Sequence, residues 1–239
     1  AAAHSFQTTH VNHAWAKRSV VYVVGDALTE DLTKLAEKTD VIGLGQCDGF
    51  FGARIVGNQL IGATVYPGCR MFNLAFQADA GVVMTIPTTQ SGIGFYGCDF
   101  LAGATTTIGL LATASTDLSV VNCNFRGSWN SNFSTAAIDL ATGSANRTLI
   151  KGCHIENDGG IGIRVNSGRT GAGSFIEDNY ISASTVTISE SSSTFYVVNN
   201  RLVSAANLGA TSHVFVATKA VGNYITAADH VNNIIPAVT

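Results

Sequence analysis

The sequence predicts an all-β fold, a right-handed parallel β-helix of about eight coils. Three observations carry the prediction: a six-residue repeat, strand-like segments between its copies, and a lack of helical periodicity. The six copies begin at residues 95, 120, 150, 176, 197 and 220 and read FYGCDF, VVNCNF, IKGCHI, IEDNYI, VVNNRL and AVGNYI. Their fourth positions lie 25, 30, 26, 21 and 23 residues apart. Such a period is typical of a solenoid, in which each unit packs only on its neighbours.

A second strand-like segment follows each of the first five copies. These segments begin at residues 108, 137, 162, 186 and 214 and read IGLLAT, AIDLAT, GIRVN, VTISE and VFVAT. Apolar and other residues alternate in them with period two, as in a half-buried strand. Turn-forming Gly, Ser, Asn and Thr fill the gaps. No window of 12 or more residues between 41 and 225 has helical periodicity, so each unit is expected to be strand, turn, strand, turn.

Identical positions of successive coils are expected to stack into columns about 4.8 Å apart. The sixth positions predict an inward stack of large apolar side chains: Phe100, Phe125, Ile155, Ile181, Leu202 and Ile225. The fourth positions predict a ladder at a turn: Cys98, Cys123, Cys153, Asn179, Asn200 and Asn223. Stacked Asn amides can hydrogen-bond along such a ladder, and a Cys there acts as a small apolar residue.

Two further copies are expected upstream. MFNLAF (71–76) fits the same frame 24 residues before FYGCDF. IVGNQL (55–60) fits by residue type but lies only 16 residues earlier, so we interpret it as a coil with a truncated loop.

These strand–Asn-turn–strand coils resemble the right-handed parallel β-helix superfamily of pectate lyases, phage tailspikes and related proteins. The resemblance covers residues 20–225. The segment VVYVVGDALTEDLTKLAEKTDVIGLG (20–45) resembles the first coil of such proteins, with a strand, a TE-x-L link and a V-x-I-x-G-x-G strand. A left-handed helix would need a strict hexapeptide rhythm, and the uneven spacing argues against one.

The chain divides into a central solenoid and two ends. Residues 1–19 are expected to cap the first coil or to dock onto a partner, residues 20–225 to form the β-helix, and residues 226–239 to close or extend it. The sequence does not begin with Met and has no signal-peptide pattern, so it is either processed or a fragment.

Composition restricts the partners. No run of 18 apolar residues predicts a membrane span, and no stripe of Lys and Arg predicts nucleic-acid binding. Only 12% of the residues are charged, the net charge is −3 and the mean hydropathy is +0.26. Either the solenoid simply buries much of its surface, or further copies cover it in a homo-oligomer, a trimer or a larger assembly.

The five cysteines are expected to be reduced. Three of them fall in the ladder column, where they have a packing role. Cys47 and Cys69 are the one pair for which we consider a disulfide.

Catalytic groups are sparse. Glycoside hydrolysis needs two carboxylates at a defined separation, and Glu156 with Asp158 is the nearest pair, although solvated loop acids are the simpler interpretation. A lyase needs acidic calcium ligands and a base. The nearest arrangement is Asp139 with Arg164, which are expected to point outward one coil apart and to meet as a surface ion pair.

Lys151 and Glu177 are expected to form a similar stacked pair. The catalytic candidates are Asp139, Lys151, His154, Glu156 and Arg164. His10 and His13 have no evident third ligand, so no metal and no cofactor are predicted.

One column suggests binding. The fifth positions of the six copies are expected to project outward in a line: Asp99, Asn124, His154, Tyr180, Arg201 and Tyr224. Such a row is a mixed solvent face, a carbohydrate-binding strip or a contact between copies.

Missing catalytic clusters and low charge favour a structural or a receptor- or carbohydrate-binding role. The resemblance implies a viral (phage) tail, spike or capsid-associated fibre component, trimeric, and located on the virion or otherwise extracellular or at the cell surface. Two alternatives stay open. One is a polysaccharide lyase or glycoside hydrolase that acts on the outer face, and the other is a self-assembling surface or filament protein.

Overall fold

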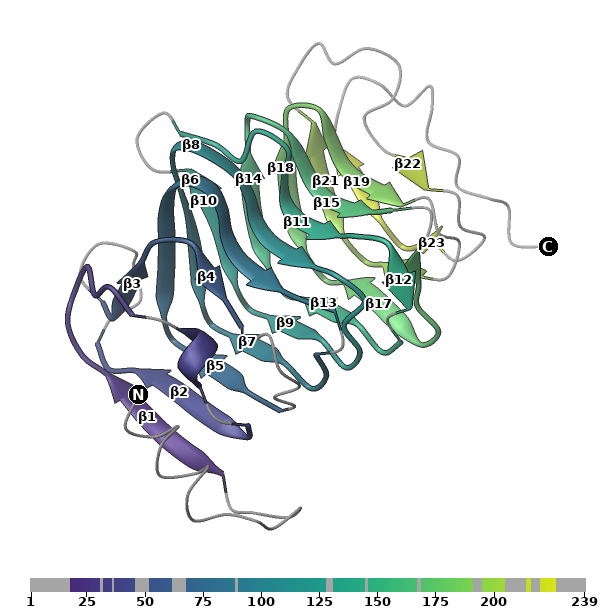
Figure 1. The fold of residues 1–239 in the computed structure, drawn as a ribbon. Coiled ribbons are helices and arrows are strands. Elements are labelled where there is room, and N and C mark those ends of the chain that lie inside the picture. Colours follow the sequence, from purple (N-terminus) through teal and green to yellow (C-terminus); the bar gives the residue numbers. More distant parts are fainter. Residues whose placement is uncertain are drawn as a thin grey trace.

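The computed structural model confirms the parallel β-helix (Figure 1). Every strand pair in the described part of the chain is parallel, and each strand pairs with its equivalent one coil later. The described residues are 18–30, 32–35, 37–45, 52–61, 68–88, 90–127, 131–144, 146–166, 169–190, 195–204, 214–215 and 220–226.

One wall is a nine-stranded sheet with one strand from each coil. In spatial and chain order its strands are β1 (Ser19–Val23), β2 (Thr39–Gly43), β5 (Arg70–Phe72), β7 (Gly94–Tyr96), β9 (Ser119–Val121), β13 (Leu149–Lys151), β17 (Ser174–Glu177), β20 (Phe195–Val198) and β23 (Ala220–Val221).

The remaining circumference belongs to a 13-stranded sheet. Two long strands, β6 (Ala75–Ile86) and β8 (Asp99–Ala112), run through its whole width. Beyond β8 the sheet divides into two rows. One row is β10 (Asn124–Gly127), β14 (His154–Asn157), β18 (Tyr180–Ala183), β21 (Arg201–Ser204) and β24 (Tyr224–Thr226). The other is β11 (Ala136–Leu140), β15 (Ile161–Val165), β19 (Val186–Glu190) and β22 (Val214–Phe215).

Short elements complete the description. On the other side of β6, the same sheet continues to β3 (Arg54–Val56) and β4 (Gln59–Leu60). A small two-stranded sheet pairs β12 (Gly143–Ser144) with β16 (Arg169–Thr170). A 3-10 turn, η1 (Leu32–Lys34), is the one helical segment of the described chain.

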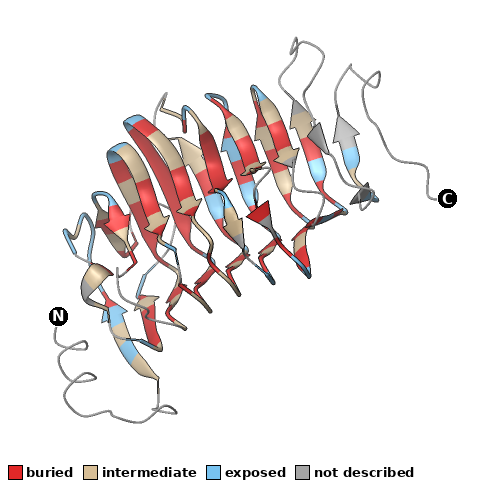
Figure 2. Cartoon of the chain, turned by 45° about the vertical axis from the view of Figure 1, so that its right-hand side comes forward, coloured by how far each residue is buried: buried red, intermediate tan, exposed pale blue. Residues whose placement is uncertain are grey.

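The core is the stack of inward side chains between the walls (Figure 2). Phe100 and Phe125 stack face to face, with ring centroids 4.5 Å apart, and Phe76 continues the stack at 5.5 Å from Phe100. Ile155, Ile181 and Leu202 follow in register and are fully buried. The side chain of Ile225 lies outside the described residues.

A single left-handed residue turns the chain from the nine-stranded sheet into the next wall. It occupies the third position of each repeat, with φ between 52° and 68°: Asn73, Gly97, Asn122, Gly152, Asp178, Asn199 and Gly222. Gly adopts this conformation without strain, and Asn and Asp tolerate it better than other residues do. This requirement explains why the third position alternates among these three residue types.

The Asn ladder follows directly after this turn. The amide nitrogen of Asn179 donates to the side-chain oxygen of Asn200 at 2.9 Å, and Asn200 donates to Asn223 at 2.9 Å. The same amides also donate to backbone carbonyls one coil back, at Ile150 and Ile176 respectively. The buried turn therefore satisfies its polar groups through the ladder.

The cysteines extend this column toward the N-terminus. Cys98, Cys123 and Cys153 are buried free thiols, and the Cys153 thiol lies 3.4 Å from the carbonyl oxygen of Val120. Cys69 is a buried free thiol too, in line with the expectation of reduced cysteines, whereas Cys47 lies outside the described residues.

The N-terminal register differs from the expectation. MFNLAF aligns as predicted, with Met71 beside Phe95 and Phe76 beside Phe100. In IVGNQL, however, Ile55 pairs with Phe76, so it holds the sixth position and not the first. The reason is that β2 already supplies the first strand of this coil, and Gly57, with φ 99°, imitates the left-handed turn.

The coil count also differs slightly from the expected eight. Five consecutive coils lie between residues 70 and 190, and further paired strands continue them at both ends. The predicted roles of residues 1–17 and 227–239 fall outside the described residues.

Candidate functional site

The fifth-position side chains lie next to one another on the outside of the β10–β14–β18–β21–β24 row. The strand register places Asn124 between Asp99 and His154, and then Tyr180, Arg201 and Tyr224 in turn. We call the row His154, Tyr180, Arg201 and Tyr224 the outer strip.

Ring contacts organise the outer strip around Tyr180. The rings of His154 and Tyr180 are 4.7 Å apart between centroids, and the guanidinium carbon of Arg201 lies 5.5 Å from the Tyr180 centroid. Tyr224, on the next coil, is 64% exposed. Tyr180 is thus held on both sides, while the strip as a whole faces solvent.

The local sequence fixes these side chains firmly. Each follows a ladder residue, and its backbone N–H donates to the ladder carbonyl of the preceding coil. The N···O distances are 2.9 Å from Tyr180 to Cys153, 2.8 Å from Arg201 to Asn179 and 2.8 Å from Tyr224 to Asn200. The residues that follow His154, Tyr180 and Arg201 point into the core, so strand alternation directs the strip outward.

Asp99, the first member of the predicted column, is not at the surface. Its side chain is 1% exposed, because residues of the next coil close over it. Asn124 donates to Asp99 Oδ1 at 2.7 Å, and Arg126 reaches Asp99 Oδ2 at 3.4 Å. Asp99 therefore keeps its predicted place in the column, but it is covered and does not belong to the exposed part of it.

Asp139 and Arg164 pair as expected, but not as a surface pair. They lie opposite each other on β11 and β15, with Arg164 Nη2 at 2.5 Å from Asp139 Oδ2. The Asp139 side chain is only 5% exposed, since Asn166 also donates to it at 2.9 Å. The hydrogen bond with Asp139 raises the pKa of Arg164. Both groups are bound to each other and are poorly placed as acid or base.

Two further ion pairs hold the remaining candidates. Lys151 Nζ lies 2.8 Å from Glu177 and 3.3 Å from Asp178, and the hydrogen bond to Glu177 is the main reason for its raised pKa. His154 Nε2 lies 3.0 Å from Glu156 Oε1 on the same strand.

The five catalytic candidates therefore occupy three places. Asp139 and Arg164 lie on the β11–β15 row, Lys151 on the nine-stranded sheet, and His154 with Glu156 on β14. Asp158 is exposed in the turn after β14.

Sequence reasoning missed one buried charge. Arg169, on β16, is fully buried and reaches back across two coils to three carbonyl oxygens, of Ala112 at 2.7 Å, Ala141 at 3.3 Å and Ser115 at 3.4 Å. Burial lowers the pKa of Arg169 to about 10. No short-range pattern in the sequence marks a contact over more than 50 residues.

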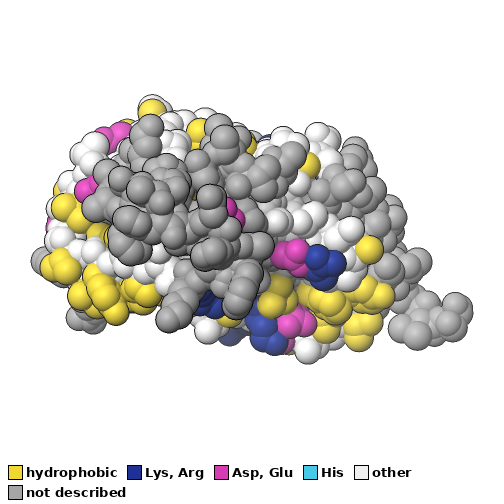
Figure 3. All heavy atoms as spheres, turned by 60° about the horizontal axis from the view of Figure 1, so that its bottom comes forward, with side chains coloured by type: hydrophobic (Ala, Val, Ile, Leu, Met, Phe, Trp, Pro, Cys, Tyr) yellow, Lys and Arg dark blue, Asp and Glu magenta, His cyan; other side chains and the backbone are white. Residues whose placement is uncertain are grey.

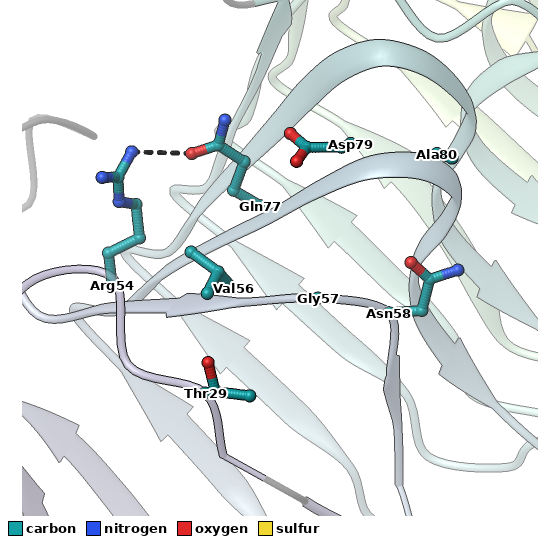
Figure 4. A pocket seen from close by; sticks show the side chains of 8 residues that line it. All are labelled: Thr29, Arg54, Val56, Gly57, Asn58, Gln77, Asp79 and Ala80. Carbon is teal, nitrogen blue, oxygen red and sulfur yellow. Dashed lines mark hydrogen bonds between the residues drawn. The ribbon is translucent and has the colours of Figure 1, made fainter.

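Near the N-terminal end, the short β3–β4 coil leaves an open hollow of about 620 Å³ beside the bend of β6 (Figure 4). Arg54 donates to Gln77 at 2.6 Å across it and is already neutralised by Asp26, at 2.6 and 3.0 Å. Asn58 and Asp79 complete its polar lining. The described residues that line the hollow include no aromatic ring, so they offer a sugar no stacking platform.

The described residues contain no group of three His, Cys, Asp or Glu side chains that could hold a metal ion. None of the helical segments in that part of the chain has the length and apolarity of a membrane crossing. The fold and surface thus define a parallel β-solenoid protein with an outward strip of aromatic and cationic side chains. No protein-family model, curated protein or solved structure matches the chain.

Proposed function

We propose that this protein is a non-enzymatic β-helix of the pectate-lyase-like and tailspike-like superfamily that binds carbohydrate through the outer strip. Its proposed setting is a viral (phage) tail, spike or capsid-associated fibre, on the virion or otherwise extracellular or at a cell surface, where copies of the chain associate.

The observation that carries this proposal is the half-buried ring of Tyr180, held between His154 and Arg201 on a rigid wall, with the exposed ring of Tyr224 on the coil after Arg201. An aromatic face suits the apolar face of a sugar ring. Arg201 suits a carboxylate or sulfate on the sugar, and the His154–Glu156 pair suits hydroxyl groups.

Spacing supports an extended glycan as the ligand. The strip presents one side chain per coil, about every 4.8 Å, which is close to the length of one sugar unit in an extended chain. Because the backbone of each strip residue is bonded to the ladder, little order has to be gained on binding.

The lyase or hydrolase alternative gains no support from the described residues. Its candidate groups lie apart, and each candidate carboxylate faces a cation or a histidine of its own. A self-assembling surface or filament protein is the second alternative, and open-ended growth of the assembly in place of a closed oligomer would favour it.

A glycan array that includes anionic polysaccharides, followed by titration of the best ligand, tests the proposal. Tyr180→Ala should weaken binding by about 3- to 10-fold, the value of one aromatic contact. Tyr180→Trp, which keeps a ring, should bind like the native chain. Arg147→Ala, an exposed arginine at a corner away from the strip, is the matched control for Arg201→Ala. Equal affinity of the native chain and Tyr180→Ala would contradict the assignment of the outer strip as the glycan-binding site. Cleavage of the glycan would favour the lyase or hydrolase alternative.

A further inference from the structure

The outer face of the nine-stranded sheet is unusually apolar for a surface that faces away from the core. Two columns of side chains point outward from its strands. The first is Val20, Asp40, Arg70, Gly94, Ser119, Leu149, Phe175 and Tyr196. The second is Tyr22, Ile42, Phe72, Tyr96, Val121, Lys151, Glu177, Val198 and Val221. We call these two columns the sheet face; solvated sheet faces normally carry polar residues at such positions.

Hydrophobic side chains gather toward both ends of this side of the molecule, with charged groups between them (Figure 3). Toward the N-terminal end Phe72 stacks on Tyr96, and toward the C-terminal end Phe175 stacks on Tyr196, with centroid distances of 5.0 and 4.9 Å. Tyr22 is 62% exposed at the N-terminal end. Two exposed apolar patches with charged groups between them mark an interaction surface.

The charges on the sheet face are arranged with opposite sign about its middle. In the N-terminal half, Asp40 is bound by Arg18 and Arg70, which leaves one net positive charge. In the C-terminal half, Lys151 is bound by Glu177 and Asp178, which leaves one net negative charge. The strand β9 lies at the centre, with four strands on each side.

This pattern is complementary to itself in one orientation. A two-fold axis along β9 brings each strand of the N-terminal half onto its counterpart in the C-terminal half of a second copy. β5 then faces β17: Arg70 lies opposite Phe175, and Glu177 is the neighbouring outward residue of the same strand, so the positive cluster lies diagonally across from the negative one. The same operation brings Tyr96 to Lys151, Ile42 to Val198 and Tyr22 to Val221 of the second copy. If the two solenoids ran in the same direction, each charged cluster would instead lie beside the same cluster of the second copy.

The size of the sheet face also suits a dimer. Nine strands at about 4.8 Å span about 38 Å, and strands with their corners are about 15 Å wide. The side chains that protrude from this rectangle increase its accessible area. The total is then near the ~800 Å² that each partner buries in a stable interface.

We propose that a second copy of this chain covers the sheet face, antiparallel, with the two-fold axis on β9. This inference rests on the association of copies that is part of the proposed function, and it names the surface responsible. The outer strip lies on a different wall, so glycan binding is measured independently.

Site-specific crosslinking tests the geometry. Val121→Cys lies on β9, so the two copies of this residue should meet across the roughly 10 Å between packed sheets and be joined by a short bismaleimide. Val198→Cys should not link to itself, but it should link to Ile42→Cys when the two variants are mixed. The native chain is the control, and its Cys69, Cys98, Cys123 and Cys153 are buried. Self-linking at both 121 and 198 would show a parallel arrangement and overturn the antiparallel one.

Sedimentation of charge variants tests the energetics. Arg70→Glu should weaken the dimer by about tenfold or more, since it sets two negative clusters against each other. Adding Glu177→Lys should restore the dimer, and Asp158→Lys, a charge reversal in the exposed turn after β14 and away from the sheet face, should leave it intact.

Three outcomes would overturn the inference, and they are distinguishable. If the chain is oligomeric but Val121→Cys never crosslinks, the copies associate through a surface other than the sheet face. A monomeric native chain overturns both the association and the sheet face, whatever the glycan result. A native monomer that dimerises when residues 1–17 are removed would show that this segment occupies the face instead.

Discussion

At the scale of single residues, two adjacent positions control each coil: the left-handed residue that turns the chain, and the ladder residue that follows it. Asn200 is fully buried and uses both ends of its amide, since it accepts from Asn179 and donates to Asn223 and to the carbonyl of Ile176. The ladder is therefore a chain of polar groups that depend on one another.

Asn200→Leu should lower the free energy of unfolding by about 1–3 kcal/mol, because it leaves buried ladder partners without hydrogen bonds. Urea denaturation of the variant gives this value. Asn199→Gly, one residue earlier, keeps the left-handed turn and should change stability by a few tenths of a kcal/mol. Equal effects of the two substitutions would show that the ladder contributes no stability of its own.

Two glycines separate backbone strain from packing. Gly162 has an ordinary φ, but an added Cβ would lie 2.5 Å from the carbonyl oxygen of Thr187 on the next coil. Gly97 has φ 60° and open space around its Cα. Gly97→Ala should cost about 1–2 kcal/mol, the strain of the left-handed region.

Gly162→Ala should cost more than Gly97→Ala, at least about 3 kcal/mol, because backbone of the adjacent coil must move. Thermal unfolding of both variants by circular dichroism checks the order. The reverse order would mean that the two coils are not in contact at this point.

The sequence predicts well which side chains of a strand point inward, because this depends on the alternation of neighbouring residues. The inward Phe125 and the ladder Asn200 each follow from neighbours within six residues, so their burial could be predicted from the repeat. Asp99 and Asp139 were misjudged because their burial depends on Arg126 and Asn166 of the next coil, which no local pattern reveals.

At the scale of elements, strand pairing joins coils through few but specific contacts. Where β1, β2 and β5 meet, Asp40 receives hydrogen bonds from Arg18 and Arg70, at distances from 2.5 to 2.9 Å. Burial acts to raise the pKa of Asp40, but the hydrogen bonds from Arg70 and Arg18 outweigh it and hold the pKa at about 2.

This pKa predicts loss of stability in acid. The folded pKa lies below the unfolded value of 3.8, so the stabilising effect is fully present above about pH 4 and is lost as the pH falls toward 2. The loss should be about 1–2 kcal/mol after screening of the two partly exposed arginines. Asp40→Asn removes the titrating group, so the variant should lose less stability than the native chain between pH 5 and pH 2.5. If urea denaturation shows equal losses of stability for the native chain and Asp40→Asn over this pH range, Asp40 is not the group responsible.

The aromatic stack is the other link between elements. Phe125, on β10, packs flat against Phe100, on β8, and is fully buried. Phe125→Ala should cost about 3–5 kcal/mol because it opens a cavity, whereas Phe125→Leu, which fills most of the space, should cost about 1–2 kcal/mol. The difference in unfolding free energy follows from the denaturant concentrations at the midpoints of unfolding, provided that the m-value is unchanged. A cost below 1 kcal/mol for Phe125→Ala would mean that the coil collapses around the gap.

The register of elements was harder to predict than their existence. IVGNQL has the residue types of the repeat but the wrong neighbours, because only pairing with β6 decides which position Ile55 holds. Arg169 shows the same limit, since its carbonyl partners lie 28 to 57 residues away. Contacts between coils at irregular corners do not repeat from one coil to the next, so no pattern in the sequence predicts them.

At the scale of the whole molecule, a solenoid joins each coil only to its neighbours, so coupling between substitutions should depend on coil separation. Phe100 and Phe125 are on adjacent coils and in ring contact. Phe125 and Leu202 lie three coils apart along the same column, about 14 Å at the usual strand spacing.

A pair of double-mutant cycles tests this picture of the whole chain. Phe100→Leu with Phe125→Leu should show a coupling of about 0.5–1.5 kcal/mol, because each substitution removes the same stacked contact. Phe125→Leu with Leu202→Ala should be additive within about 0.3–0.5 kcal/mol, because no contact is shared. Substantial coupling in the distant pair would mean that the coils unfold with long-range cooperation that the stacked contacts do not provide. A second copy that covers several coils at once would supply such cooperation, so the distant cycle should be measured below the concentration at which the chain associates.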